Sequence, residues 1–168
     1  ILEKLLFPLD TQNVDVEQFM SYATQSNPTS SLIDQYVNLH RDWSWETDEN
    51  EVSLNCITEV APKDLKLGKT LVLGAGGCRL AQDIYNEFNC ESMVVLDINP
   101  LLFLVAERIM SGNSQELYEF VPLPIESSDF AVKRTLRSSK TQDDGLTFLL
   151  ADAMDLCFKE KVFDTVIT

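Results

Sequence analysis

The feature of this sequence that most restricts its fold is a short apolar run, Thr70–Leu73, that leads directly into Gly74-Ala75-Gly76-Gly77. Glycine lets the backbone bend sharply there and approach a ligand with no Cβ in the way. The residues after the turn have a helical apolar pattern, so the turn would face unpaired N–H groups and the positive end of a helix dipole. Strand–glycine–helix turns also occur for packing reasons alone. The turn by itself therefore leaves a nucleotide-like ligand and a purely structural role both open.

Three further apolar runs follow along the chain: Met93–Leu96, Leu146–Leu150 and Phe163–Thr168. Helical segments separate the runs, and Asn99-Pro100 has the residue types that begin a helix. Short apolar strands separated by helices are typical of a parallel sheet covered by helices on both faces. The sequence therefore predicts an α/β, doubly wound and mainly parallel sheet.

The stretch between Gly112 and Gly145 is longer than a simple crossover between two strands needs. Pro122 and Pro124 forbid a regular helix around them. We expect an insertion with a short helix of its own around Phe130–Leu136. Four basic residues at roughly helical spacing favour a solvated loop or helix face there: Lys133, Arg134, Arg137 and Lys140.

Residues 1–69 differ in character from residues 70–168, because they show helical and irregular patterns without strands. We expect a domain boundary at this point, with residues 1–69 forming an N-terminal helical cap or lid that contains a helix-capping turn at residues 27–30. One predicted helix carries an apolar face made of Leu32, Tyr36, Leu39 and Trp43. This face either helps wall a substrate pocket or covers the open side of the fourth strand.

The only histidine of the chain and both tryptophans lie close together in this cap. The lid interpretation places His40, Arg41 and Trp43 nearest to a small-molecule substrate. In the alternative interpretation, Trp43 is a packing anchor and His40 is a core residue with a hydrogen-bond partner.

The composition excludes several classes of protein. A formal net charge of −14 repels phosphate backbones, so nucleic acid is not expected as a partner. No run of about 18 apolar residues exists to span a membrane. Four cysteines without a C-x-x-C pair and a single histidine give no metal site, and they are typical of a reduced, cytoplasmic protein.

Two carboxylates follow predicted strands at positions where a ligand could bind. Asp97, at the end of the second strand, can accept hydrogen bonds from ribose hydroxyls, although it can also cap the helix that begins at Asn99-Pro100. Asp152 follows the third strand and can accept from an adenine amino group. Leu156 and Phe158 are near enough in sequence to cover an apolar ring.

Four segments together resemble the successive cofactor motifs of class I S-adenosylmethionine (SAM) dependent methyltransferases: LVLGAGGCRLA, VVLDINP, LLADAMDL and FDTVIT. The resemblance covers about residues 70–168 and implies a Rossmann-like fold. It implies that the glycine turn lines the methionine part of SAM, that the second strand's end holds the ribose and that the third strand's end holds the adenine. The residues that it assigns to SAM are Gly74, Ala75, Gly76, Asp97, Ile98, Asp152 and Ala153.

The sequence departs from the family pattern at three points. Val72 stands where the family often has an acid, Cys78 stands where it has a third glycine, and the chain ends at Thr168. The last departure predicts that further strands of the sheet lie outside this sequence. The expected function is methyl transfer to a small molecule, with the acceptor, a catalytic residue and the oligomeric state all open. An NAD(P)-binding oxidoreductase and a non-catalytic Rossmann-like interaction module are the alternatives.

Overall fold

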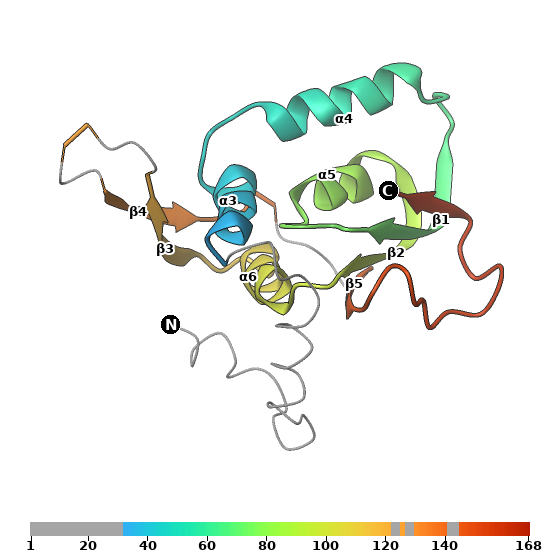
Figure 1. Cartoon of the computed structure of the whole chain (residues 1–168). Helices are drawn as coiled ribbons and strands as arrows, with labels where there is room; N and C mark the ends of the chain where they lie inside the picture. The colour runs from blue at the N-terminus through green and yellow to red at the C-terminus, as the bar shows by residue number, and fades with distance from the viewer. Residues whose placement is uncertain (1–31, 122–124, 127–129, 141–144) are drawn as a thin grey trace.

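The structure, a computed structural model, describes residues 32–121, 125–126, 130–140 and 145–168 (Figure 1). The turn predicted at residues 27–30 lies outside this part of the chain. The described part combines a four-stranded sheet, four helices and a separate two-stranded hairpin.

The four-stranded sheet is parallel throughout and confirms the predicted α/β class. Its strands are β1 (Lys66–Leu73), β2 (Asn89–Asp97), β5 (Leu146–Leu150) and β6 (Thr165–Ile167), in the order β5-β2-β1-β6. β1 and β2 are longer than predicted at their amino ends, and β1 starts before the boundary expected between residues 69 and 70.

The order of the strands reverses once along the chain. From β1 the sheet grows through β2 to β5, and the chain then returns to add β6 on the other side of β1. In open parallel sheets, ligands bind beyond the carboxyl ends of the strands at such a reversal. The residues at and after the carboxyl ends of β1, β2 and β5 are therefore the candidates for a ligand site.

One face of the sheet is covered by α5 (Arg79–Glu87) and α6 (Pro100–Met110). The register aligns Val72 of β1 with Val95 of β2, and both side chains lie in the core formed with these helices. Most of the side chains that α6 turns toward this core are at most 6% exposed. Because adjacent parallel strands need a crossover, each helix also connects two neighbours in the sheet.

The other face has a different environment in the described part of the chain, where no helix packs on it. Leu71 and Leu96 are buried there, whereas Val94 and Leu149 are half-buried and Val166 is 54% exposed. Helices were expected on both faces, and the described residues supply them on one.

The helices α3 (Leu32–Trp43) and α4 (Glu49–Val60) add a second layer on the face of the sheet that α5 and α6 cover. α3 packs against α5, α6 and the hairpin, with Leu39 and Trp43 fully buried, and α4 packs against α5. Tyr36, Leu39 and Trp43 of the predicted apolar face thus pack into the core beside these helices and do not cover the side of β6. Within the described ranges, no helix has the length and apolar character needed to cross a membrane.

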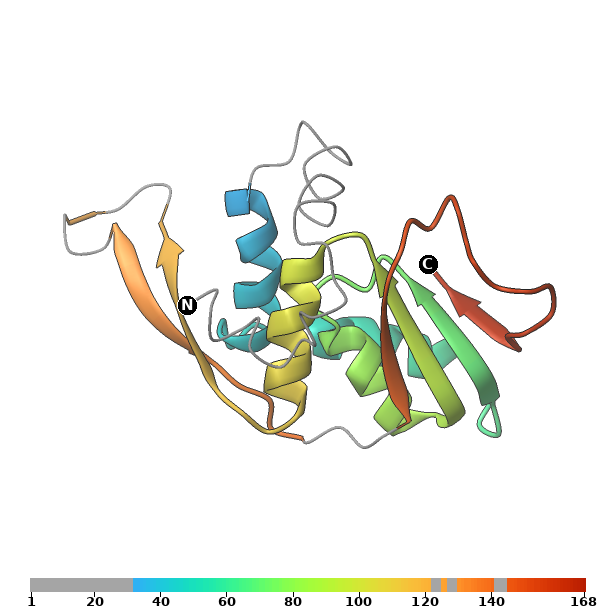
Figure 2. The same ribbon diagram turned by 90° about the horizontal axis from the view of Figure 1, so that it is seen from below.

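The helix predicted around Phe130–Leu136 is wrong. β4 (Ala131–Leu136) pairs with β3 (Gln115–Phe120) in an antiparallel hairpin, on the opposite side of the helices from the sheet (Figures 1 and 2). The two strands alternate exposed and buried residues, and Leu117 and Leu136 are buried against the helices. Two of the four basic residues belong to this alternation: Lys133 pairs with Glu116 at 2.7 Å and Arg134 pairs with Glu119 at 2.8 Å, whereas Arg137 and Lys140 come after β4.

Candidate functional site

The glycine turn after β1 needs glycine for its backbone conformation. Gly74 and Gly76 have φ angles of +66° and +55°, a region that other residues adopt only at a cost. A Cβ on either glycine would meet no other atom within 4 Å. The turn is therefore bent by its own backbone and borders open space, as a surface that approaches a ligand requires. The N–H group of Ala75 donates to the carbonyl of Leu96 at 3.1 Å and ties the turn to β2.

Asp97 connects the glycine turn to the start of α6. Its Oδ2 accepts from the N–H of Gly76 at 2.9 Å, and its Oδ1 accepts from the N–H of Asn99 at 2.9 Å. The predicted cap is confirmed at Asn99, whose side chain accepts from the N–H of Leu101. A carboxylate has about four acceptor positions. Asp97 thus has capacity left for a ligand while it holds the turn.

The end of β5 lies beside the end of β2, because the N–H of Ala151 donates to the carbonyl of Asp97 at 3.2 Å. Asp152 is exposed, and its Oδ1 accepts from the N–H of Met154 at 2.8 Å. This contact forms a small turn that fixes the carboxylate near the strand end. The hydrogen bonds of Gly76, Asp97 and Ala151 therefore bring three strand ends together.

Apolar side chains accompany these polar groups. Ile98, Leu150 and Leu156 are 43%, 40% and 40% exposed. Phe158, proposed from the sequence to cover a ligand ring, packs edge-on against Phe163 at a centroid distance of 4.8 Å. Ile98 follows Asp97 directly, and Ala153 next to Asp152 is exposed. Contact with a planar apolar ring is more favourable for large apolar side chains at strand ends than contact with water is.

The two departures within the turn region have a structural explanation. Val72 is 7% exposed in the core, where an ionised acid would have no water. Cys78 is the N-cap of α5 and has a φ of +65°, which explains why glycine suits this position better. Burial, together with the carboxylates of Asp97 and Asp42, raises the pKa of the Cys78 thiol well above its ordinary value. This cysteine therefore stays protonated.

The carboxyl end of α3 is fastened to the glycine turn. The indole N–H of Trp43 donates to the carbonyl of Gly77 at 2.8 Å. The carboxylate of Asp42 lies so close to Gly77 that a Cβ there would stand 2.3 Å from Oδ2. Arg79 covers the ring of Trp43, with its guanidinium carbon 5.7 Å from the centroid. No sequence pattern predicts this role for Asp42, Gly77 or Arg79, because their contact depends on tertiary packing.

Asp42 is an unusual acid, since it is only 5% exposed. It accepts from Nε of Arg41 at 2.9 Å and from the side-chain amide of Asn50 at 3.4 Å. Burial raises the pKa of Asp42 above its ordinary value, and the charge of Arg41 offsets part of that effect. Arg41 also lies 3.8 Å from Glu49 of α4.

The side chain of His40 lies near the hairpin residues Glu119 and Tyr118. It is 1% exposed, and its Nδ1 lies 3.1 Å from Oγ of Ser44. Its ring stacks on Trp45 at 6.5 Å. Burial lowers the pKa of His40, against the opposing influence of Glu119 and the Tyr118 backbone. The packing interpretation of His40 describes this environment, whereas the lid interpretation needed an accessible side chain.

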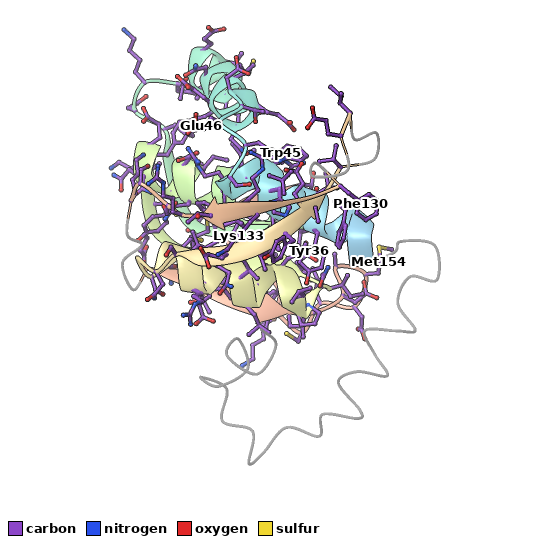
Figure 3. All side chains as sticks on the ribbon, turned by 90° about the vertical axis from the view of Figure 1, so that its left-hand side faces the viewer. Tyr36, Trp45, Glu46, Phe130, Lys133 and Met154 are labelled. Atoms are coloured by element: carbon purple, nitrogen blue, oxygen red, sulfur yellow. The ribbon has the colours of Figure 1, made fainter. Side chains whose placement is uncertain are left out.

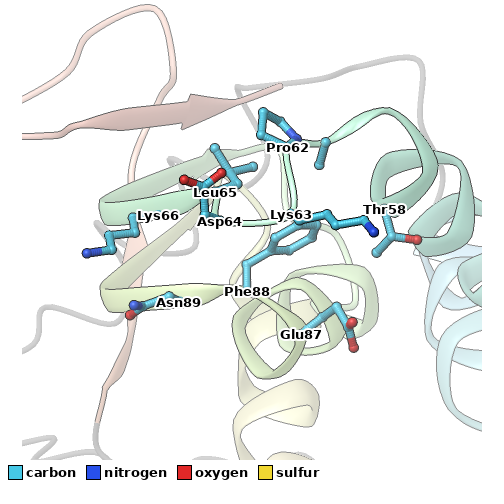
Figure 4. A pocket seen from close by; sticks show the side chains of 10 residues that line it. Thr58, Pro62, Lys63, Asp64, Leu65, Lys66, Glu87, Phe88 and Asn89 are labelled. Atoms are coloured by element: carbon cyan, nitrogen blue, oxygen red, sulfur yellow. The ribbon is translucent and has the colours of Figure 1, made fainter.

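Two cavities lie near the helices and strands that carry these residues. One, of about 720 Å³, is lined by Arg41 and Trp43 together with the turn between α3 and α4, the start of α5 and the end of β4. The other, of about 440 Å³, lies at the amino ends of β1 and β2 beside Lys66 and Asn89, opposite the glycine turn (Figure 4). Neither cavity is lined by Gly74, Gly76, Asp97 or Asp152.

Comparison with known proteins adds no relationship: no protein-family model matches this chain, and no curated protein matches it.

Proposed function

We propose that this chain is the cofactor-binding part of a SAM-dependent methyltransferase with a doubly wound, Rossmann-like sheet, and that its methyl acceptor is a small molecule. One observation carries the proposal. The Asp97 carboxylate holds the N–H of Gly76 at 2.9 Å, and Gly74 and Gly76 face open space. A strand-end acid joined to an open glycine turn suits a ligand that has both a ribose and a chain running from it.

The residues present fit SAM in chemistry. The open side of Gly74 and Gly76 would take the methionine part, and the remaining acceptor positions of Asp97 would take the ribose hydroxyls. Asp152 would accept from the adenine amino group, with Ile98 against the ring and the backbone of Ala153 nearby. Bound SAM supplies a methyl group on a positively charged sulfur, ready for transfer to a nucleophile.

The part played by the chain itself is alignment and exclusion of water. Two reactants held end to end react faster because the entropy of bringing them together is lost on binding. Trp43 and Asp42, which pack against Gly77, limit the access of water to the turn from the side of α3. Alignment with removal of water accelerates a displacement at carbon without a dedicated base.

Calorimetric titration with S-adenosylhomocysteine, and separately with NAD⁺, tests this function. We expect S-adenosylhomocysteine to bind and NAD⁺ not to bind. Asp97→Asn should weaken the binding about tenfold, because it removes a hydrogen-bonded charge. Glu91→Gln is the matched control, since Glu91 is an exposed acid near the opposite end of the same strand. Binding of NAD⁺ alone would favour an oxidoreductase, and binding of neither would favour an interaction module.

A further inference from the structure

The cavity of about 720 Å³ beside α3 is formed by three segments that are far apart in the sequence. These are the end of α3 with the turn into α4 and the start of α4, the first residue of α5, and the end of β4 with the residues that follow it. Trp45 and Glu46 of the turn lie beneath α4 in Figure 3, above the hairpin strand that carries Lys133. Small-molecule sites in proteins have volumes of roughly 300–1,000 Å³. The cavity therefore has the capacity for a ligand.

Its two walls carry opposite charge. The wall from α5 and the end of β4 has two arginines, three hydroxyl groups and no carboxylate: Arg79, Thr135, Arg137, Ser138 and Ser139. The wall from the α3–α4 turn and α4 has two glutamates and no base: Glu46, Thr47, Asn50 and Glu51. A ligand that spans the cavity would therefore meet donors at one end and acceptors at the other.

The charges on each wall differ in how much they are already neutralised. Arg79 bonds Asp83 at 2.8 Å, and Arg41, between the walls, bonds Asp42 at 2.9 Å. Arg137 forms no ion pair with any described residue, and the same holds for Glu46 and Glu51. The N–H of Arg137 donates to the carbonyl of Trp43 at 3.2 Å, so its backbone is fixed beside the cavity.

Aromatic rings lie between the two walls of the cavity. Both tryptophans of the chain, Trp43 and Trp45, line it. The ring of Trp43 is buried beneath Arg79, whereas Trp45 is half-buried and stacks on His40 with one side of its ring. Aromatic rings bind other rings and also attract cations to their faces.

We propose that this cavity binds a small zwitterion of the aromatic amino acid class. Arg137 takes its carboxylate, Glu46 and Glu51 take its ammonium group, and Trp45 takes its ring. We also assign this ligand as the methyl acceptor of the reaction, and that assignment rests on the proposed function. The binding of the zwitterion in the cavity does not rest on it. Trp43 joins the two sites, because it lines the cavity and bonds Gly77 of the glycine turn.

The fluorescence of the protein reports directly on this binding, since no tryptophan lies elsewhere in the chain. Three probes share the phenylethyl framework and differ in the charged groups that it carries: L-phenylalanine, phenethylamine, which lacks the carboxylate, and 3-phenylpropionate, which lacks the ammonium group. Each is titrated into the full chain without cofactor. We expect a saturable change with all three and the tightest binding with L-phenylalanine, because it engages both walls.

Variants then test the contribution of each wall of the cavity to binding separately. Arg137→Gln should weaken L-phenylalanine and 3-phenylpropionate about tenfold and leave phenethylamine within about twofold. The double variant Glu46→Gln/Glu51→Gln should weaken L-phenylalanine and phenethylamine by a similar factor and spare 3-phenylpropionate. Lys133→Gln is the matched control for Arg137→Gln, because Lys133 is an exposed cation of β4, the strand that directly precedes Arg137, and it does not line the cavity. All of these side chains are exposed, so circular dichroism should show unchanged folding.

Two results would overturn the proposal. One is the absence of a saturable change with L-phenylalanine, and the other is an equal loss of all three probes in each variant. Neither depends on SAM. A chain that binds S-adenosylhomocysteine but no probe keeps the proposed function and loses this site, and the reverse result keeps the site alone.

Discussion

Replacement of Gly77 by alanine tests how tightly α3 is fastened to the glycine turn. Gly77 has no positive φ, so alanine fits its backbone conformation. The added Cβ would lie 2.3 Å from Oδ2 and 3.0 Å from Cγ of Asp42. Asp42 has little freedom to move away, because it is 5% exposed and bonded to Arg41 and Asn50. Gly77→Ala should therefore destabilise the fold by about 1–3 kcal/mol, the usual cost of overpacking.

The size of this effect should depend on Asp42. Asp42→Ala removes the two closest atoms and leaves only its own Cβ, 3.2 Å from the added methyl group. In that background Gly77→Ala should cost about 1–2 kcal/mol less than in the wild type. Urea denaturation of the four proteins gives the four free energies of unfolding and hence the coupling between the two positions.

Gly76→Ala provides the control for that cycle. A Cβ at Gly76 meets open space, but φ is +55°, so the variant should lose about 1 kcal/mol through backbone strain alone. Asp42→Ala should not change that loss. If Gly77→Ala and Asp42→Ala were additive to within about 0.5 kcal/mol, the contact between α3 and the turn would be refuted.

Three further predictions concern single side chains. Asp152→Asn should abolish the preference for S-adenosylhomocysteine over its inosine analogue in competitive binding, because the amide turns a donor toward the adenine amino group; an unchanged preference contradicts that role. His40→Gln should flatten the decrease in unfolding free energy that the wild type shows below pH 6.5, where the unfolded state takes up a proton that the buried ring resists; parallel pH curves from urea denaturation contradict this. Cys78 should resist iodoacetamide in the folded chain while the exposed Cys56 and Cys157 react, as mass spectrometry would show, and rapid labelling of Cys78 contradicts its burial.

The strands that the sequence predicted well are those whose apolar runs have clear ends. β5 has the predicted bounds, Leu146–Leu150, because Gly145 precedes the run and the polar residue Asp152 follows closely. β1 and β2 begin earlier than predicted, at Lys66 and Asn89. Their first residues are largely polar and exposed, so hydrophobicity alone does not mark them as strand.

The hairpin was missed because its charged residues were interpreted at helical spacing. The period of two was present in the sequence, with Val132 and Arg134 on one side of β4 and Lys133 and Thr135 on the other. The sequence of β4 does not reveal its partner strand: all six residues of β4 pair with residues of β3, and no apolar run marks β3 as a strand.

The candidate site also has one part that could be predicted from the sequence and one part that could not. The positions of Asp97 and Asp152 at the carboxyl ends of β2 and β5 could be predicted, because parallel strands bring their ends to one edge, whereas their role toward a ligand stays a prediction. The cavity beside α3 could not be predicted. Arg79 and Arg137 line it together although they are far apart in the chain, and only the packing of α3 against α5 and the hairpin brings them to one place.

Backbone amide chemical shifts, recorded while S-adenosylhomocysteine is added to isotope-labelled protein, test the central claim most directly. The proposed site predicts the largest shifts at Gly74–Gly76, at Asp97 and Ile98, and at Asp152 and Ala153. It predicts little change at Lys63–Lys66, beside the cavity at the amino ends of the strands. Shifts concentrated at that opposite end, or no shifts at saturating ligand, would contradict a SAM site at the carboxyl ends.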